Sequence, residues 1–223
     1  MNAFPFDIVG FDLDGTLLDT HRDLAHALNH TLVRDGRQMI PIEEVRPMIG
    51  GGARKMLARA LEVSGRTVDD ARFEELHDAL LEYYEANIAV ESCLFPGGEE
   101  MLQDLEQSGV RLTVVTNKLE RFAKKILMQL GLADRFVTII GGDTLGPGCA
   151  KPKPDLLLEM LRRAGEGRAA YVGDTTYDTR AALAANIPCV AVRFGFNDIP
   201  VEDMGAAAVI SHFDELVPAL RRL

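Results

Sequence analysis

Short apolar runs alternate with amphipathic stretches along most of this chain, and this alternation is the sequence feature that most limits its fold. The apolar runs predict strands, most of which end at Gly, Asp, Thr or Asn: Asp7–Phe11, Leu112–Thr116, Val137–Gly141, Ala169–Gly173, Cys189–Arg193 and Ala208–Ile210. The stretches between them predict helices: Gly97–Ser108, Glu120–Leu130, Lys153–Ala164, Thr176–Ala185 and Phe213–Arg222. Such alternation is typical of βαβ units around a parallel sheet.

One long segment, from about His21 to Ala89, breaks this alternation because it contains no convincing strand pattern. It holds helical patterns instead: Arg22–Arg34, Ala53–Val63 and Ala71–Ala89. The sequence therefore predicts an α/β protein with a Rossmann-like parallel sheet core flanked by helices. We expect residues 1–19 and 93–223 to form this core, and residues 20–92 to form an all-helical cap domain inserted after the first strand.

The composition of the chain limits which kinds of molecule it can bind. The chain of 223 residues carries a net charge of −10, which argues against nucleic acid or an anionic membrane as its main partner. Cys93, Cys149 and Cys189 are scattered without a CxxC pair, so no disulfide framework or zinc site is indicated. The first residues lack a signal-peptide pattern, and no apolar run is long enough to span a membrane. We expect a cytoplasmic protein, either a monomer or a homodimer.

Two acidic residues, Asp12 and Asp14, follow the first predicted strand in the stretch FDLDGT. Residues two apart on an extended chain share a face. Two unit charges about 4 Å apart repel by roughly 4 kcal/mol at an effective dielectric of about 20. The pair therefore requires a nearby cation or a proton on one group. A calcium loop of the EF-hand kind does not fit, because Gly15 stands too early in the pattern.

More polar residues follow the other predicted strands. Thr116 and Asn117 end one strand, Asp174 ends another, and Asp178 lies four residues further along. Ligands of open α/β sheets bind beyond the carboxyl ends of the strands, so these side chains are expected to converge there. Several carboxylates in one place require a hard cation, and Mg²⁺ binds few protein carboxylates and completes its shell with water and substrate phosphate. The expected cofactor is Mg²⁺.

Lys151, in the stretch KPKPD, supplies a point charge of the kind that binds phosphate. Thr116 can donate a hydroxyl hydrogen bond at a strand end, and its neighbour Asn117 is a further candidate for contact with phosphate. Together with the carboxylates these groups suggest phosphoryl transfer to a carboxylate nucleophile. A neighbouring carboxyl such as Asp14 can hold the leaving-group proton and then take a proton from water.

These stretches resemble the four motifs of the haloacid dehalogenase-like phosphohydrolase superfamily, in order and over nearly the whole chain. The resemblance implies Asp12 as nucleophile, Asp14 as acid and base, and Thr116 and Lys151 as phosphate-binding residues. It also implies that Mg²⁺ is bound by Asp12, by the backbone carbonyl of Asp14 and by Asp174, with support from Asp178. The helical insert is similar to the family's small cap domain. An acid at Asp14 argues against the dehalogenase branch of the family.

Within this superfamily, the chain resembles the phosphoglycolate phosphatases in six stretches: IGGGARKMLARAL, FPGG, VVTNK, GGD, KPKPD and FGFN. It implies a small anionic phosphorylated metabolite as substrate, with 2-phosphoglycolate favoured. The chain departs from the family at Asn186, where Gly is usual, and Asn is the next-best residue for a left-handed helix end.

A glycine run at Gly50–Gly52 precedes a predicted helix that carries Arg54. It lacks the spacing of a P-loop, but a glycine loop at a helix N-terminus can bind an anion. We hypothesise that Gly51 and Arg54 close on the substrate's carboxylate, and a plain hinge or helix start is the alternative. Two further alternatives stay open: a phosphatase or phosphomutase for a sugar or nucleotide phosphate, and a catalytically silent regulator that binds phosphate or Mg²⁺.

Overall fold

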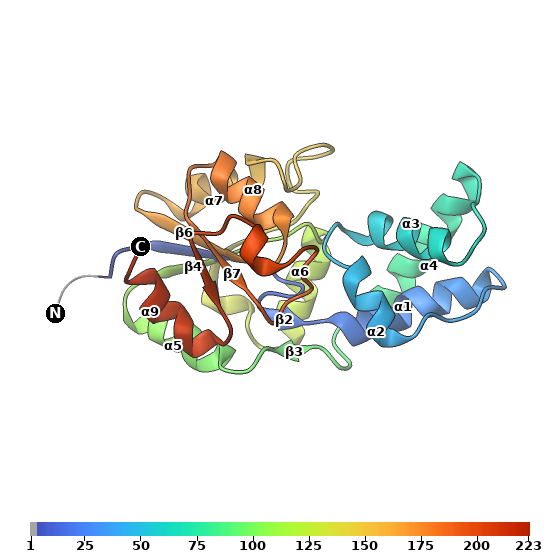
Figure 1. The fold of residues 1–223 in the computed structure, drawn as a ribbon, viewed down its shortest axis with the longest axis horizontal. Coiled ribbons are helices and arrows are strands. Elements are labelled where there is room, and N and C mark those ends of the chain that lie inside the picture. Colours follow the sequence, from blue (N-terminus) through green and yellow to red (C-terminus); the bar gives the residue numbers. More distant parts are fainter. Residues whose placement is uncertain (1–3) are drawn as a thin grey trace.

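A six-stranded parallel sheet forms the centre of the computed structural model, which describes residues 4–223 (Figure 1). The strand order is β5-β4-β1-β6-β7-β8, and every neighbouring pair is parallel. The strands are β1 Ile8–Phe11, β4 Arg111–Val115, β5 Phe136–Ile140, β6 Ala169–Gly173, β7 Cys189–Val192 and β8 Ala208–Ile210. The predicted parallel α/β class is confirmed, with strand ends within one residue of those expected.

Helices cover both faces of this sheet, because its strands are apolar on both sides. They are α5 Gly98–Gln107, α6 Glu120–Gln129, α7 Asp155–Ala164, α8 Thr176–Ala184 and α9 Leu216–Leu220. Helices α5, α6 and α9 share one apolar cluster with the sheet, and α7 and α8 share another on the opposite face. Burial on both faces explains why the strands lack the polar alternation of a half-exposed sheet.

The last predicted helix, Phe213–Arg222, is wrong in its extent. The structure has a 3-10 turn at Phe213–Glu215, and the α-helix α9 begins only at Leu216. Pro218 explains the difference, because proline lacks a backbone N–H and is tolerated only in the first turn of an α-helix. A helix that began at Phe213 would place this proline in its interior.

The segment after β1 contains helices and no strand of the central sheet, as expected. Its elements are α1 His21–Arg34, α2 Ile42–Val45, the 3-10 turn η1 Arg46–Met48, α3 Ala53–Val63 and α4 Asp70–Ala86. Two short antiparallel strands, β2 Leu18–Asp19 and β3 Cys93–Leu94, pair where the chain enters and leaves this segment (Figure 1). Two-residue strands carry no periodic signal, so the sequence pattern could not predict them. Within residues 4–223, no helix combines the length and apolarity needed to cross a lipid bilayer.

Asn186 ends the turn after α8 in a left-handed conformation, with φ of 57°. Asparagine and glycine reach this region at lower cost than other residues. We therefore expect Asn186→Gly to change the free energy of unfolding by no more than a few tenths of a kcal/mol, and Asn186→Ala to lower it by about 1 kcal/mol. Urea denaturation of the three proteins measures both values. Equal losses in the two variants would contradict the backbone explanation.

Candidate active site

The carboxyl ends of three adjacent strands carry the acidic residues. Asp12 follows β1, Thr116 follows β4 and Asp174 follows β6, and β1 lies between the other two strands. Asp178 lies in the first turn of α8, which begins just after β6. One carboxylate oxygen from each of Asp12, Asp174 and Asp178 lies within 4.8 Å of the others, and all three residues are buried. The structure thus brings three of the four predicted carboxylates together.

Lys151 provides the positive charge for this cluster. Its Nζ donates to Asp178 Oδ1 at 2.6 Å, to Tyr171 Oη at 2.9 Å and to Val115 O at 3.0 Å, and it also lies 3.0 Å from Asp12 Oδ1. An ammonium group has only three protons. Asp12 Oδ1 is consequently a buried oxygen that lacks a directed hydrogen bond, even though an ammonium group is near. This oxygen requires a further positive partner.

Burial and mutual repulsion both oppose ionisation of the carboxylates in this cluster. Burial, together with repulsion from Asp178 and Asp14, raises the pKa of Asp12 to about 6 against the opposing attraction of Lys151. Burial and the same kind of repulsion raise the pKa of Asp174 well above its usual range. Burial alone would lower the pKa of Lys151, but the attraction of Asp12 and Asp178 outweighs it and raises this pKa to about 12. The three carboxylates exceed the charge that Lys151 can balance.

Asp174 is held in place so that it retains free lone pairs. Thr16 Oγ1 donates to its Oδ1 at 2.8 Å, and the backbone N–H of Phe196 donates to its Oδ2 at 2.7 Å. Gly195 packs so closely that an added Cβ would lie 2.3 Å from the Asp174 Cβ. Each fixed oxygen can accept one more partner, so Asp174 and the unsatisfied Asp12 fit a small hard cation that takes oxygen ligands.

Asp178 has a different environment, because its oxygens are already engaged. It forms a capping box with Thr175, whose N–H and Oγ1 donate to Oδ2 at 3.0 and 2.6 Å. Its other oxygen accepts from Lys151. Asp178 therefore both caps α8 and fixes Lys151 beside Asp12. The resemblance implies a supporting role for Asp178 beside the metal, and that role stays a prediction.

Asp14 lies outside the cluster and points toward a second lysine. Its Oδ1 accepts from Thr20 Oγ1 at 2.7 Å, and both of its oxygens lie 2.8 Å from Lys118 Nζ. The side chain of Lys118 is only 5% exposed. The sequence patterns do not single out Lys118, although it ends the stretch VVTNK and lies two residues after Thr116. A buried position for such a lysine cannot be read from the spacing alone.

Thr116 and Asn117 lie at the edge of the cluster. Thr116 Oγ1 accepts from the Lys118 N–H at 3.2 Å, so its own proton stays available for a ligand. The side-chain amide of Asn117 donates to Lys151 O at 3.0 Å and accepts from Lys151 N at 2.9 Å. This pairing occupies both ends of the amide, which favours a role in positioning the Lys151 loop over direct contact with phosphate.

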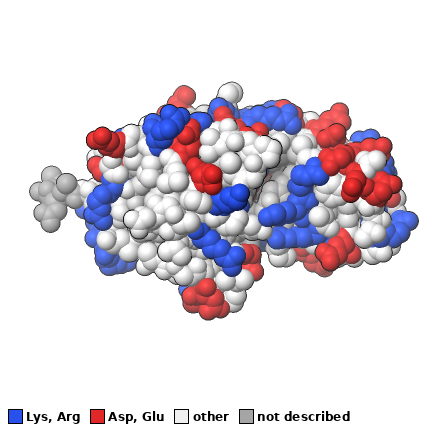
Figure 2. All heavy atoms as spheres, turned by 90° about the horizontal axis from the view of Figure 1, so that it is seen from above, with Lys and Arg blue, Asp and Glu red and all other residues white. Residues whose placement is uncertain are grey.

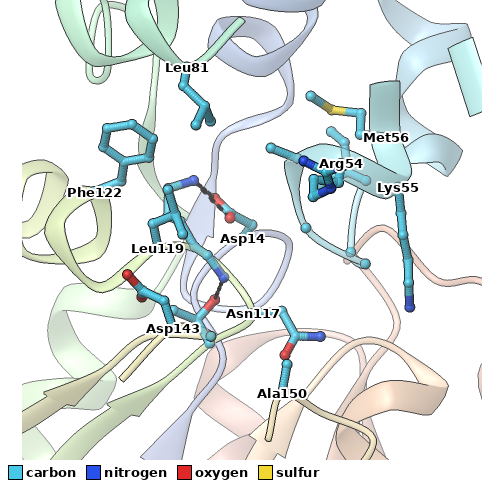
Figure 3. Close-up of a pocket in the computed structure, with 18 of the residues that line it drawn as sticks. Asp14, Arg54, Lys55, Met56, Leu81, Asn117, Leu119, Phe122, Asp143 and Ala150 are labelled. Carbon is cyan, nitrogen blue, oxygen red and sulfur yellow. Dashed lines mark hydrogen bonds and ion pairs between the residues drawn. The ribbon is translucent and has the colours of Figure 1, made fainter. Parts of the chain in front are cut away.

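A cavity of about 470 Å³ separates these residues from the helical segment. Its lining includes Asp12, Asp14 and Lys151 from the sheet side, together with Gly51 and Arg54 from the start of α3. Figure 3 shows Asp14 between Leu119 and Phe122 on one side and Arg54 and Met56 on the other. Much of the remaining lining is apolar, as Leu80, Leu81 and Tyr84 illustrate. The cavity joins the reactive carboxylates to a mainly apolar chamber.

The glycine run comes close to the carboxyl edge of the sheet. A Cβ at Gly50 would lie 3.2 Å from Thr175 Cγ2, and one at Gly51 would lie 3.3 Å from Tyr177 Oη. Arg54 extends away from this edge, because its guanidinium pairs with Glu74 at 2.5 and 2.7 Å and lies 5.0 Å from the centre of the Phe73 ring. Gly51 thus approaches the site, whereas the Arg54 charge is already balanced within the helical segment.

Basic side chains gather near this cavity despite the net charge of −10. On the face shown in Figure 2, Lys and Arg side chains lie on both sides of the hollow between the sheet and the helical segment. Basic side chains beside a site can draw small anions toward it even on an acidic protein.

Comparison with known proteins agrees with this geometry. The family model described as haloacid dehalogenase-like hydrolase matches residues 9–192. A phosphoglycolate phosphatase from Mesorhizobium japonicum is 40% identical over 215 residues, which cover 96% of this chain and 94% of the relative. The crystal structure of a predicted phosphoglycolate phosphatase from Haemophilus somnus superposes with a TM-score of 0.87 at 27% identity and covers 96% of this chain and 97% of its own. A CbbY mutant from Rhodobacter sphaeroides, in complex with xylulose-(1,5)bisphosphate, has a TM-score of 0.80 at 25% identity, with coverages of 96% and 99%.

Proposed function

Because this chain belongs to the haloacid dehalogenase-like hydrolase family and is a phosphoric monoester hydrolase, we propose that it converts 2-phosphoglycolate to glycolate and phosphate. We further propose that the reaction requires Mg²⁺ and passes through a phosphoryl group on Asp12. The observation that carries the proposal is the buried Asp12 Oδ1, which lies 3.0 Å from Lys151 Nζ, lacks a directed hydrogen bond and belongs to a residue that lines the cavity. The phosphatase name of the relative supports the choice of substrate.

In the first step, a carboxylate oxygen of Asp12 attacks the phosphorus and the bond from phosphorus to the ester oxygen breaks. Lys151 and the Thr116 hydroxyl stabilise the charge on the phosphoryl oxygens, and Asp14, in its protonated form, gives its proton to the departing oxygen. Asp12, Asp174 and the Asp14 carbonyl would hold Mg²⁺, which would supply further positive charge to the phosphoryl group. The products of this step are glycolate and a phosphoryl group on Asp12.

In the second step, Asp14 is a carboxylate and takes a proton from a water molecule. That water attacks the phosphorus, and the bond between phosphorus and the Asp12 oxygen breaks. Phosphate leaves, Asp12 is again a carboxylate and Asp14 again carries a proton. Every proton that Asp14 gives in the first step is thus returned in the second.

A second candidate substrate is a sugar phosphate or bisphosphate, hydrolysed or rearranged by the same residues. The observation that favours it is the cavity of about 470 Å³, which falls in the range of about 300–1,000 Å³ typical of sites for larger ligands. The related CbbY structure contains xylulose-(1,5)bisphosphate. A two-carbon substrate fills only a small part of such a cavity unless the helical segment closes further.

A panel of phosphate esters, assayed with Mg²⁺ and again with an excess of chelator, tests the proposal. We expect kcat/KM for 2-phosphoglycolate to exceed that for sugar and nucleotide phosphates by roughly tenfold or more, since one well-placed charged contact is worth at least this much. We expect the chelator to remove the activity. A higher kcat/KM for a sugar phosphate would favour the second candidate, and full activity in chelator would contradict the metal requirement.

A further inference from the structure

Lys118 has one proton beyond those that it donates to Asp14. Its Nζ donates hydrogen bonds to the two oxygens of Asp14, both at 2.8 Å, and lies beside Tyr84. An ammonium group carries three protons, so one remains. Lys118 as a whole residue is 8% exposed, and it lines the cavity. Its Nζ forms an ion pair with Asp14 at 2.8 Å, which favours the charged ammonium.

Tyr84 supplies a second unused donor beside Lys118. It belongs to α4 in the helical segment, is 2% exposed, and has a hydroxyl without a hydrogen-bond partner among the described residues. Its ring centre lies 4.6 Å from Lys118 Nζ, and it lines the same cavity. A buried hydroxyl without a partner costs roughly 1–3 kcal/mol, which a ligand at this position would offset.

The other cations of the cavity are poorer candidates for a ligand. Arg54 forms two hydrogen bonds with Glu74 and is more than half exposed in its side chain. Lys55 donates to Tyr177 Oη at 3.3 Å at the outer edge. Lys151 already donates to Val115 O, Tyr171 Oη and Asp178 Oδ1, and it lies beside Asp12, where the phosphoryl group is proposed to bind. Lys118 is therefore the buried cation of the cavity with capacity for an additional anion.

The position of Lys118 also fits the length of the proposed substrate. In 2-phosphoglycolate, a single methylene separates the ester oxygen from the carboxyl carbon. Asp14 is the proposed proton donor to that ester oxygen, and Lys118 contacts Asp14 directly. A carboxylate one methylene from the ester oxygen thus falls beside the Lys118 ammonium, whereas the second phosphate of a bisphosphate lies several carbons further away.

We propose that Lys118 and Tyr84 bind the carboxylate of the substrate and thereby determine the preference of this enzyme for a phosphorylated 2-hydroxy acid. This inference rests on the proposed function, and it replaces Arg54 with Lys118 as the carboxylate partner. Lys118 bridges the substrate's carboxylate and Asp14, so the group that selects the substrate also holds the proton donor. Tyr84 adds a neutral hydrogen bond from the helical segment.

The test compares two esters of the same carbon number, 2-phosphoglycolate and ethyl phosphate, which lacks the carboxylate. Lys118→Met is expected to lower kcat/KM for 2-phosphoglycolate about 100-fold more than for ethyl phosphate, because a buried charged contact is lost. Tyr84→Phe is expected to lower the ratio of kcat/KM for 2-phosphoglycolate to kcat/KM for ethyl phosphate by roughly five- to tenfold. Lys118→Arg, which keeps the charge, should recover part of the preference.

Two further variants serve for comparison. Lys125→Met removes a lysine of α6 that donates to Glu85 O outside the cavity, and it should leave the preference unchanged. Arg54→Met should change kcat/KM for both substrates by the same factor. The inference would be overturned if Arg54→Met lowered kcat/KM for 2-phosphoglycolate more than for ethyl phosphate. It would also be overturned if Lys118→Met lowered both values equally. If Lys118→Met fails to fold, Tyr84→Phe and Lys118→Arg test the inference through the ratio of kcat/KM for the two esters.

The wild-type enzyme separates this inference from the proposed function. A wild type that hydrolyses both esters with equal kcat/KM overturns both, because no carboxylate preference then exists. A wild type that prefers 2-phosphoglycolate, and keeps that preference in Lys118→Met and Tyr84→Phe, overturns only the assignment of the carboxylate partner.

Discussion

Asp12→Asn is expected to lower kcat for 2-phosphoglycolate by roughly 10⁴-fold or more, since removal of a covalent nucleophile has effects of this size or larger in other enzymes. The amide nitrogen is not a nucleophile toward phosphorus, and its neutral oxygen is a weak one. The change also removes one negative charge from a cluster in which repulsion helps to raise the pKa of Asp12. We therefore expect the metal-free variant to be at least as stable as the wild type.

Steady-state kinetics and urea denaturation measure these two effects separately. Asp134→Asn is a matched control, because Asp134 is exposed in the 3-10 turn after α6, and this variant should keep the wild-type kcat. Activity within about tenfold of wild type in Asp12→Asn would contradict the role of Asp12 as nucleophile. A large loss of stability together with the loss of activity would instead show that Asp12 is needed for folding.

Lys151→Met is expected to have the second-largest effect, on both activity and stability. It leaves Asp12 and Asp178 buried without their ammonium partner, and breaking a buried ion pair in this way costs about 3–5 kcal/mol. We expect kcat/KM to fall by roughly 10³-fold, since a cation beside the phosphoryl group is lost as well. Added Mg²⁺ should restore part of the lost stability because it supplies positive charge to the same carboxylates.

The stability loss in Lys151→Met should depend on pH. The pKa of Asp12 is raised to about 6, so the folded state binds its proton more tightly than the unfolded state does. Removal of Lys151, which opposes this rise, shifts the pKa further upward. A carboxyl group of this kind destabilises the folded protein as the pH rises above its unfolded pKa. The variant should therefore lose more free energy of unfolding at about pH 8 than at about pH 5.

Lys153→Met provides the control for this experiment, because Lys153 lies two residues further in the same loop and is exposed. Its free energy of unfolding should stay within about 0.5 kcal/mol of the wild type at both pH values. A Lys151→Met protein with wild-type stability and no pH dependence would show that the buried carboxylates do not rely on Lys151.

Much of the fold was predictable because the sheet is buried on both faces. Its strands are continuous apolar runs such as Ala169–Gly173, and the structure has that strand with the same limits. The pattern fails where an element is too short to show periodicity, as in β2 and β3, or where one residue overrides it, as Pro218 does in α9. The division into a sheet core and a cap remains a prediction.

The candidate site was predictable where residues follow strands directly. Asp12 and Asp174 follow strands that are neighbours in the sheet, so the βαβ topology alone brings them together. Lys118 and Tyr84 were not predictable in this way, because they meet only when α4 packs against the segment after β4. No spacing along the chain encodes that contact. The roles of Asp12, Asp14, Thr116, Lys151 and Asp174 in catalysis remain proposals that the experiments above address.

The most direct test of the central claim is a rapid acid quench of the enzyme during turnover of substrate labelled with ³²P. If Asp12 accepts the phosphoryl group, labelled protein should form within the first turnover and release its label on treatment with hydroxylamine, which cleaves acyl phosphates. The label should be absent from Asp12→Asn. It should also be absent from wild-type enzyme that is incubated with excess chelator before the substrate is added. Turnover without labelled protein at any time point, or labelled Asp12→Asn, would contradict the account.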